Sequence, residues 1–234
     1  MKPEYENATV RKTLDIGIRT SSPISESAEN EIALLERRLS ELFAGQTIRI
    51  ADIGCGDGRH ALRFARGIEA ANLQCKKYVG FEISSAMVEQ ARKRVAEARL
   101  EHVAIVEGNA LTADLVEAPY HVAWCLFFTA GNLRDLGLPL EAYDDAYLDK
   151  NPAFSGVVRR FYESLVPGGR LFFTIYKDVP LAEQAQHTVY EQCGMTVITR
   201  PGNRFVATNE GFWSVRWTRE SVLSNLSESR IPPE

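Results

Sequence analysis

One short stretch combines glycines and a carboxylate in an order that suits a cationic ligand. Residues 48–58 read I-R-I-A-D-I-G-C-G-D-G, with Asp52 two residues before the first of three alternating glycines, Gly54, Gly56 and Gly58. Such glycines let the chain turn sharply and leave bare main chain against which a ligand can lie. A carboxylate beside that turn would repel a pyrophosphate and attract a positive charge. The stretch therefore favours a ligand that carries a cation.

A second acid follows at a suitable distance. Glu82 ends the apolar run Tyr78-Val79-Gly80-Phe81-Glu82, one strand–helix–strand unit after the glycines. At this spacing, a carboxylate in nucleotide-binding folds meets the ribose hydroxyls. A surface acid at a strand end is the alternative, and the order of the two segments favours the ribose partner.

The elements around these residues predict a parallel sheet. Ile48, Ile50 and Ile53 give the first stretch the β-branched, apolar character of a buried parallel strand. Residues 59–65 then have helical spacing, so the glycine loop joins a strand to a helix N-terminus, where doubly wound sheets bind nucleotide-like ligands. The third glycine comes one residue earlier than in the dinucleotide pattern G-x-G-x-x-G, which argues against an NAD-linked oxidoreductase.

The glycine stretch resembles motif I of the class I S-adenosylmethionine-dependent methyltransferases. Ile50, Asp52 and the three glycines match that motif position by position, and the run L-x-P-G-G at 165–169, between a helix and a strand, matches another family hallmark. The resemblance spans roughly residues 48–176. It implies an α/β fold with a doubly wound, mostly parallel sheet of the seven-stranded type, helices on both faces and an N-terminal helical cap. It also implies S-adenosyl-L-methionine as cofactor, with S-adenosyl-L-homocysteine as product.

The resemblance also implies roles for particular residues. Asp52 would lie near the methionine end of the cofactor and Glu82 at the ribose. Asn109 stands where the family commonly has an acid near the adenine; its amide could still meet the adenine amino group, and a turn asparagine is the alternative. The predicted cofactor-binding residues are Asp52, Gly54, Cys55, Gly56, Gly58, Glu82, Ile83, Asn109, Ala110 and Phe127.

The acceptor is expected beyond the predicted strand 121–128, at residues 127–133. This segment has neither the [DNS]-P-P-[YFW] tetrapeptide of nucleic-acid amine methyltransferases nor the Pro-Cys of cytosine C5 enzymes. Candidate catalytic groups are His60, Asn132 and Tyr143, for each of which a packing or turn role is the alternative. The sequence thus predicts methyl transfer to a nitrogen or oxygen of a small molecule. An RNA or protein methyltransferase, or a cofactor-binding partner without turnover, is the alternative.

The chain is expected to form one domain over residues 1–234. Residues 1–44 are expected to form an N-terminal cap, with a helix over 28–44 capped by Ser27. Tyr5 and the region 11–19 are candidates for a lid, and a frayed terminus without a function is the alternative. Residues 45–234 form the core, with an acidic, tyrosine-containing insertion at 134–151 that is either a flap or a solvated loop.

The last third departs from the family pattern. Strands at 195–199 and 204–208 are expected to form a hairpin about residues 201–203, followed by a strand at 212–216 and a final helix capped by Thr218. No room for two strands remains after that helix. Either these strands close the main sheet or its edge is abbreviated.

The composition limits the kinds of partner that the chain is expected to bind. The net charge of −4 lacks the basic excess of most nucleic-acid binders. The four cysteines form no C-x-x-C pair, which argues against a zinc site or disulfides. No apolar run approaches the roughly 20 residues of a membrane span. We expect a cytoplasmic monomer or homodimer without metal, nucleic-acid or membrane partners.

Overall fold

A five-stranded parallel sheet forms the centre of the protein, in a computed structural model that describes residues 4–12 and 23–231. Its strand order is β3-β2-β1-β4-β5, and every pair is parallel. The order reverses between β1 and β4, so the carboxyl ends of these strands diverge into a crevice. The strands are β1 (Thr47–Ile53), β2 (Gln74–Glu82), β3 (Val103–Glu107), β4 (Tyr120–Cys125) and β5 (Leu165–Phe173).

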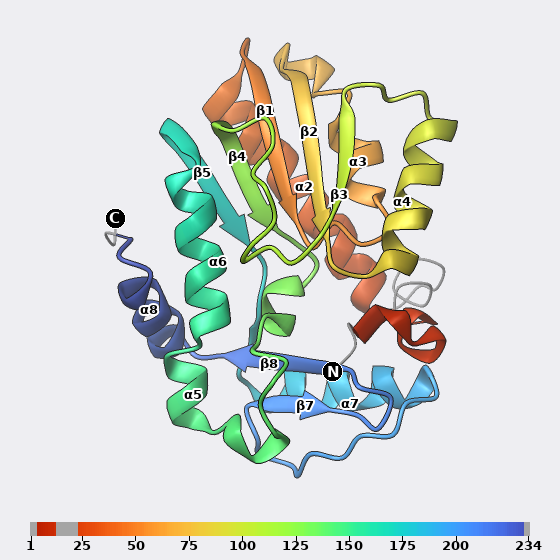
Figure 1. The fold of residues 1–234 in the computed structure, drawn as a ribbon, viewed down its shortest axis with the longest axis vertical. Coiled ribbons are helices and arrows are strands. Elements are labelled where there is room, and N and C mark those ends of the chain that lie inside the picture. Colours follow the sequence, from red (N-terminus) through yellow and green to blue (C-terminus); the bar gives the residue numbers. More distant parts are fainter. Residues whose placement is uncertain (1–3, 13–22, 232–234) are drawn as a thin grey trace.

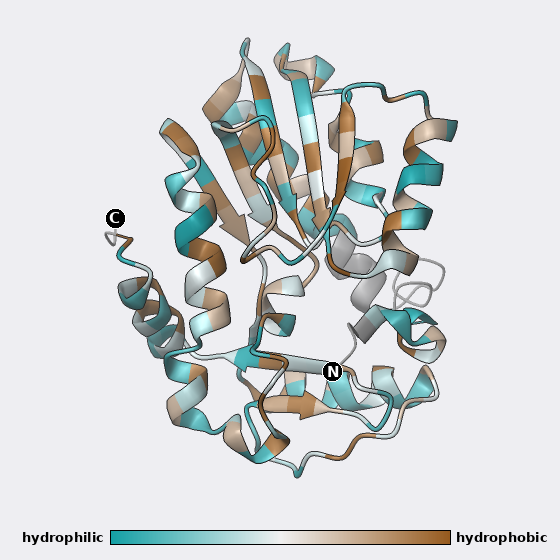
Figure 2. Ribbon diagram, viewed as in Figure 1, coloured by the Kyte–Doolittle hydropathy of each residue, from teal (hydrophilic) through white to brown (hydrophobic). Residues whose placement is uncertain are grey.

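Helices cover both faces of this sheet (Figure 1). On one face lie α2 (Pro23–Phe43), α3 (Arg59–Phe64) and α4 (Ser85–Glu97), whose buried residues join those of the strands in one core cluster. On the other face, α6 (Pro152–Glu163) buries Phe154, Val157 and Phe161 against the sheet. Apolar residues run through the central strands, with hydrophilic residues on the outward helix surfaces (Figure 2). The predicted fold class is confirmed.

A second, smaller sheet lies across the carboxyl ends of the main strands (Figure 1). It has the order β6-β8-β7, formed by β6 (Tyr176–Lys177), β8 (Trp213–Trp217) and β7 (Phe205–Ala207). Beside it are α7 (Pro180–Gln192), α8 (Arg219–Glu228) and the short turn η1 (Glu4–Glu6). Because the C-terminal strands build this sheet, the main sheet has five strands and its edge is abbreviated. The main sheet therefore departs from the seven-stranded type that the sequence predicted.

Several boundaries differ from the sequence prediction for local reasons. The fourth strand stops at Cys125, because Phe127 and Phe128 adopt positive φ angles of 50° and 63°, which no strand accommodates. Residues 195–199 form only one isolated bridge, Val197 to Thr208. Instead β7 pairs antiparallel with β8 across a turn at Gly211, whose φ is +92°.

The expected ends of the chain are only partly described. Helix α2 begins at Pro23, so the predicted cap Ser27 lies inside the helix, and its side chain is outside the described residues. Of the predicted lid region 11–19, residues 13–19 are also outside them. Thr218 caps α8 as predicted, accepting a hydrogen bond from the backbone N–H of Ser221. None of the described helices combines the length and apolar character that crossing a membrane requires.

The insertion at 134–151 packs onto the small sheet. It contains the turn η4 (Leu140–Ala142) and the helix α5 (Asp145–Asp149). Tyr143 is buried, with its ring 5.2 Å from that of Trp213, and its hydroxyl donates to the carbonyl of Asp135 at 2.6 Å. The predicted flap is therefore held against the small sheet through its tyrosine.

Candidate functional site: a pocket at the carboxyl edge of the sheet

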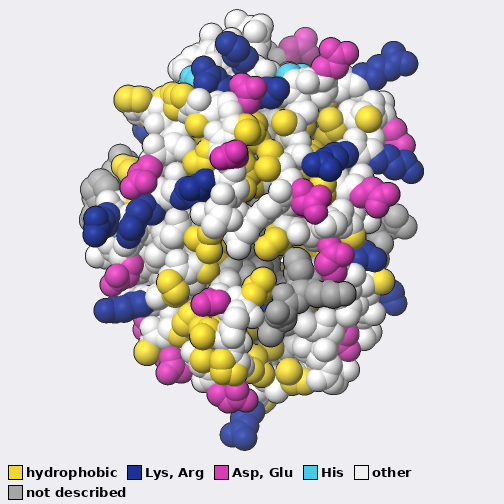
Figure 3. Space-filling model, in the orientation of Figure 1, with side chains coloured by type: hydrophobic (Ala, Val, Ile, Leu, Met, Phe, Trp, Pro, Cys, Tyr) yellow, Lys and Arg dark blue, Asp and Glu magenta, His cyan; other side chains and the backbone are white. Residues whose placement is uncertain are grey.

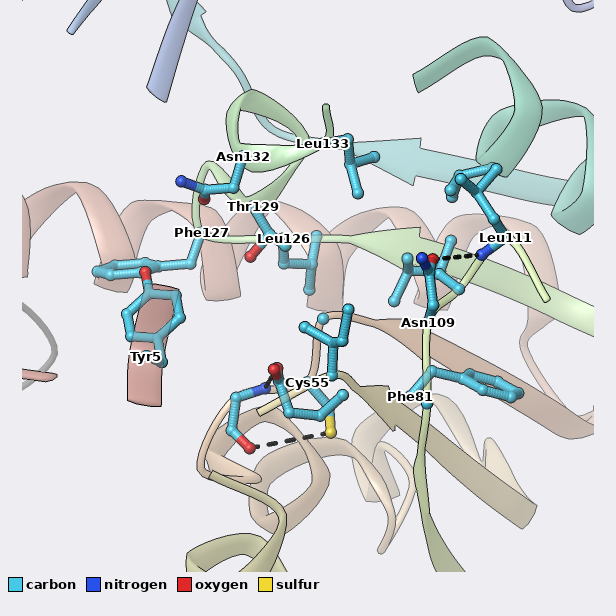
Figure 4. Close-up of a pocket in the computed structure, with 18 of the residues that line it drawn as sticks. Tyr5, Cys55, Phe81, Asn109, Leu111, Leu126, Phe127, Thr129, Asn132 and Leu133 are labelled. Carbon is cyan, nitrogen blue, oxygen red and sulfur yellow. Dashed lines mark hydrogen bonds between the residues drawn. The ribbon is translucent and has the colours of Figure 1, made fainter. Parts of the chain in front are cut away.

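A pocket opens where the strand order reverses, at the carboxyl ends of β1, β2 and β4. Its walls come from the glycine loop, the end of β2, the loop 108–111 and the loop 126–134, with contributions from η1 and α6. Phe81, Asn109 and Leu111 lie at one end, and Tyr5 and Phe127 lie at the other (Figure 4). The eight predicted residues on its walls are Gly54, Cys55, Gly56, Glu82, Ile83, Asn109, Ala110 and Phe127.

The three glycines serve different purposes. Gly54 has φ +70°, and a Cβ atom there would lie 2.3 Å from Cγ2 of Thr129. The loop can therefore pass the Thr129 side chain only because residue 54 is a glycine. Gly56 lines the pocket and has φ +52°. A Cβ atom on this residue would have no protein atom within 4 Å, so a side chain there would occupy open space. Gly58 does not line the pocket; a Cβ there would lie 3.1 Å from that of Ala91, which places it at the packing of α3 against α4.

Cys55 fills the space between the loop and the neighbouring strand. A Cβ atom on Gly80 of β2 would lie 2.6 Å from Sγ of Cys55, so these two small residues are packed together. Burial raises the pKa of the thiol well above its usual value, which keeps it protonated. Cys55 is therefore an inert wall of the pocket.

Glu82 is held in place by the glycine loop itself. Its Oε2 accepts the backbone N–H of Gly56 at 3.0 Å, and its Oε1 accepts that of Ser84 at 2.9 Å. Burial raises its pKa despite these two hydrogen bonds. Each oxygen keeps a lone pair, so the carboxylate can accept two further hydrogen bonds. A pair of adjacent hydroxyls, as on a ribose, matches this geometry.

Asp52 lies behind the pocket wall. It faces Gly80 in the register of β1 with β2, so it shares a sheet face with Glu82, two residues further on. It is buried and does not line the pocket, and its Oδ2 accepts the hydroxyl of Tyr78 at 2.6 Å. Burial raises its pKa. Asp52 could therefore act on the methionine end of a cofactor only through its charge, across the glycine loop. This role stays a prediction.

The asparagine predicted near the adenine makes a turn and also faces the pocket. Oδ1 of Asn109 accepts the backbone N–H of Leu111 at 2.9 Å, which is the turn role weighed as an alternative. Its side chain nevertheless lies on the wall, opposite Phe81 (Figure 4). The amide is thus fixed in orientation at the end of the pocket remote from Tyr5.

The end of the pocket that contains Tyr5 is shaped by Phe127 and Phe128, both of which have positive φ angles. The backbone N–H of Phe127 donates to Oε1 of Glu31 at 2.9 Å, and that of Phe128 donates to Oγ1 of Thr174 at 3.0 Å. Consecutive non-glycine residues in this conformation are strained and persist only where their surroundings fix them, often at functional sites. Asn132 lies on the same wall and donates to the carbonyl of Trp213 in β8.

Only two of the three catalytic candidates predicted from the sequence lie in the pocket wall. His60 and Asn132 line the pocket, whereas Tyr143 is buried away from it. The structure adds Glu31, whose Oε2 lies 3.5 Å from Nε2 of His60. The sequence contains a signal for Glu31, because it lies four residues before Leu35 and eight before Leu39, on the stripe that α2 buries.

Residues 50–169, just over half the chain, match the family described as methyltransferase domain. The chain belongs to this family. It is a class I S-adenosylmethionine-dependent methyltransferase, and S-adenosyl-L-methionine is its cofactor. The open space at Gly56 and the paired acceptors of Glu82 agree with such a ligand.

The fold of this methyltransferase is shared by solved structures of low sequence identity. The PH0226 protein of Pyrococcus horikoshii is 16% identical, with 96% of this chain and 89% of that chain covered, at a TM-score of 0.55. An S-adenosylmethionine-dependent methyltransferase of Clostridium acetobutylicum is 10% identical, with 85% and 78% covered, at a TM-score of 0.54. No curated protein matches the sequence.

Proposed function

We propose that this methyltransferase transfers a methyl group to a nitrogen or oxygen of a small-molecule acceptor. The cofactor supplies a methyl group that a sulfonium already activates. The chain must align the acceptor and exclude water around it, which can by itself supply several kcal/mol of barrier reduction. The ten residues predicted to bind the cofactor are part of this proposal, with Asp52 and Gly58 acting from behind the wall.

The observation that carries the proposal is the aromatic end of the pocket. Beyond the glycine loop and Glu82, the pocket continues to Tyr5, Phe127 and Asn132. This end combines aromatic rings with a few polar groups, among them the amide of Asn132 and the guanidinium of Arg59, which lies 5.9 Å from the centre of the Phe127 ring. Such a lining suits a small ligand that is oriented by few polar groups. It lies at the loop after β4, next to the glycine loop, so an acceptor there would be adjacent to the methionine end of the cofactor.

The N-terminal segment narrows the access to this end. Oε1 of Glu6 accepts hydrogen bonds from the hydroxyl of Ser84 at 2.9 Å and from the N–H of Ala86 at 3.3 Å. Val10 is fully buried in a cluster with Tyr190 and Phe212 of the small-sheet region. The segment is thus fixed both to α4 and to the small-sheet region, with Tyr5 over the pocket. Such a mouth favours a compact acceptor.

Surface charge supports the same choice. On the face shown in Figure 3, acidic and basic side chains are interspersed and do not gather into a basic patch. A nucleic-acid substrate would require such a patch. We also propose that the protein is a cytoplasmic monomer or homodimer, a view that its four free cysteines support.

Two measurements test the proposal. Calorimetry with S-adenosylmethionine, S-adenosylhomocysteine and NAD should show binding of the two adenosyl compounds alone. Incubation with labelled cofactor and panels of amines, phenols, total RNA and mixed proteins should then label only small molecules. Label in RNA or protein would overturn the choice of acceptor, and binding without any transfer would favour a partner subunit without turnover.

A further inference from the structure

A buried acid–histidine pair adjoins the pocket, with His60 in its wall and Glu31 behind it. His60 is the second residue of α3, and Glu31 comes from α2, outside the segment that matches the family. Oε2 of Glu31 lies 3.5 Å from Nε2 of His60, and both side chains are only 8% exposed. His60 lines the pocket together with Phe127. A buried charge of this kind is costly unless it serves a partner.

The two oxygens of Glu31 have different tasks. Oε1 accepts a hydrogen bond from the backbone N–H of Phe127. Within the described part of the chain, Oε2 forms no hydrogen bond that meets the usual geometry, and it lies 3.5 Å from Nε2 of His60. Although burial acts to raise it, the contacts with His60, with the backbone N–H of Phe127 and with the side chain of Thr174 lower the pKa of Glu31 below its usual value, so the group is a carboxylate at neutral pH. A carboxylate at this distance favours the tautomer of the ring that carries its proton on Nε2.

That tautomer leaves Nδ1 as the basic nitrogen of His60. No described residue forms a hydrogen bond with Nδ1. The charged groups that face the ring are Glu31 of α2 and Asp52 of β1, both acidic. Arg59, the neighbour on α3, is paired with Asp57 at 2.9 Å. An imidazolium at this position would therefore lie beside two acidic side chains.

Resting on the proposed function, we propose that His60 accepts the proton that the acceptor loses during methyl transfer, with Glu31 as its positioning residue. A lone pair of the nucleophile forms the new bond to the methyl carbon, and the bond between that carbon and sulfur breaks with its electrons left on sulfur. The proton of the nucleophile passes to Nδ1 of His60. The positive charge thus moves from sulfur to imidazole, and the pocket holds one cation before and after the step.

This exchange of charge can be measured without knowing the acceptor. The methionine and homocysteine forms of the cofactor share every ionisable group and differ by the sulfonium methyl. A protonated His60 repels the sulfonium form and tolerates the neutral thioether. S-adenosylhomocysteine should therefore bind with uptake of protons, and S-adenosylmethionine with less.

The experiment is calorimetry of both compounds in two buffers of different ionisation enthalpy. From about pH 8 to about pH 5, where histidine changes charge, the ratio of the two affinities should shift about tenfold in favour of S-adenosylhomocysteine. His60→Asn should abolish the shift. Glu31→Gln should reduce it while its amide oxygen still accepts the N–H of Phe127. Glu29→Gln, an exposed acid on the same helix, and His187→Asn on α7 should leave it unchanged.

The wild-type measurement decides the matter even where a variant fails to fold. Equal proton uptake with the two compounds, or a difference that persists in His60→Asn, overturns the inference. If neither compound binds, the proposed function fails and the inference fails with it, and this outcome is distinct from equal uptake.

Discussion

The two ends of the pocket are built from parts of the chain that lie at different distances in the sequence. At the end formed by the glycine loop, the N–H of Gly56 meets Glu82 from 26 residues away, within one strand–helix–strand unit. At the aromatic end, Phe127 depends on Glu31 across 96 residues, and Asn132 on Trp213 across 81. The first end is a property of a motif, and the second is a property of the whole fold.

This difference suits the two tasks. The donor end presents mainly backbone and one carboxylate, and its shape is fixed by a loop whose glycines leave little freedom to vary. The proposed acceptor end draws on η1, α2 and β8, elements that lie outside the glycine loop. A family can thus keep one cofactor while its members alter the acceptor.

The largest effect should follow from filling the donor end. In Gly56→Val the side chain projects into the pocket, and φ of +52° strains a β-branched residue. We expect the affinity for S-adenosylhomocysteine to fall by roughly 100-fold or more, measured by calorimetry. Gly45→Val is the matched control, because Gly45 has φ +72° with nothing within 4 Å and lies outside the pocket. Equal binding by both variants would show that the cofactor does not lie against Gly56.

The next effect should come from the carboxylate. Glu82→Ala removes the acceptors for two hydroxyls and leaves the N–H groups of Gly56 and Ser84 without partners. We expect affinity for both adenosyl compounds to fall at least about tenfold, since a hydrogen bond to a charged group contributes about 1.5–3 kcal/mol. Glu107, which faces Glu82 in the register of β3 with β2 and is exposed, provides the control Glu107→Ala. Unchanged affinity in Glu82→Ala would remove the ribose assignment.

The contrast between the two ends also explains what the sequence could predict. The glycine loop and the acid of β2 carry local signals, because turn geometry depends on neighbouring residues. The choice of methyltransferase family rested on these local signals.

The remaining parts depended on long-range pairing. Residues 195–199 have a strand-like composition, but β7 pairs with β8, so the predicted hairpin is reduced to a single antiparallel bridge between Val197 and Thr208. Tyr143 belongs to an acidic loop that the sequence allowed to cover the pocket, and its contacts with the distant rings of Trp213 and Phe205 help to bury it elsewhere. Competition between pairings of this kind is not encoded in any short window.

Asp52 tests whether a charge behind the wall contributes to the donor end. Burial raises its pKa more than Tyr78 and His60 lower it, so its ionised form costs stability once the pH exceeds the aspartate value of the unfolded chain, about 3.9. Asp52→Asn should therefore raise the free energy of unfolding by about 1 kcal/mol at pH 7, and the gain should vanish as the pH falls below that value.

The same variant should weaken the binding of S-adenosylmethionine about fivefold, and of S-adenosylhomocysteine less, because the lost charge acts on the sulfonium. Urea denaturation at several pH values and calorimetry give the two quantities. Tyr78→Phe, which keeps the charge of Asp52 but removes its 2.6 Å hydrogen bond, should instead lower stability. A loss of stability in Asp52→Asn at pH 7 would show that the carboxylate is a structural anchor.

The smallest effect on the donor should come from the aromatic end. Tyr5 lines the same end of the pocket as Phe127, and its ring centroid lies 6.3 Å from that of Phe212 in the small-sheet region. Tyr5→Ala should therefore change the affinity for S-adenosylhomocysteine by no more than about twofold, because separate sites act nearly independently. Tyr162→Ala, on the exposed side of α6, controls for the loss of a tyrosine. A tenfold loss in Tyr5→Ala alone would mean that the N-terminal segment belongs to the donor site, and the division of the pocket into a motif-built end and a fold-built end would no longer hold.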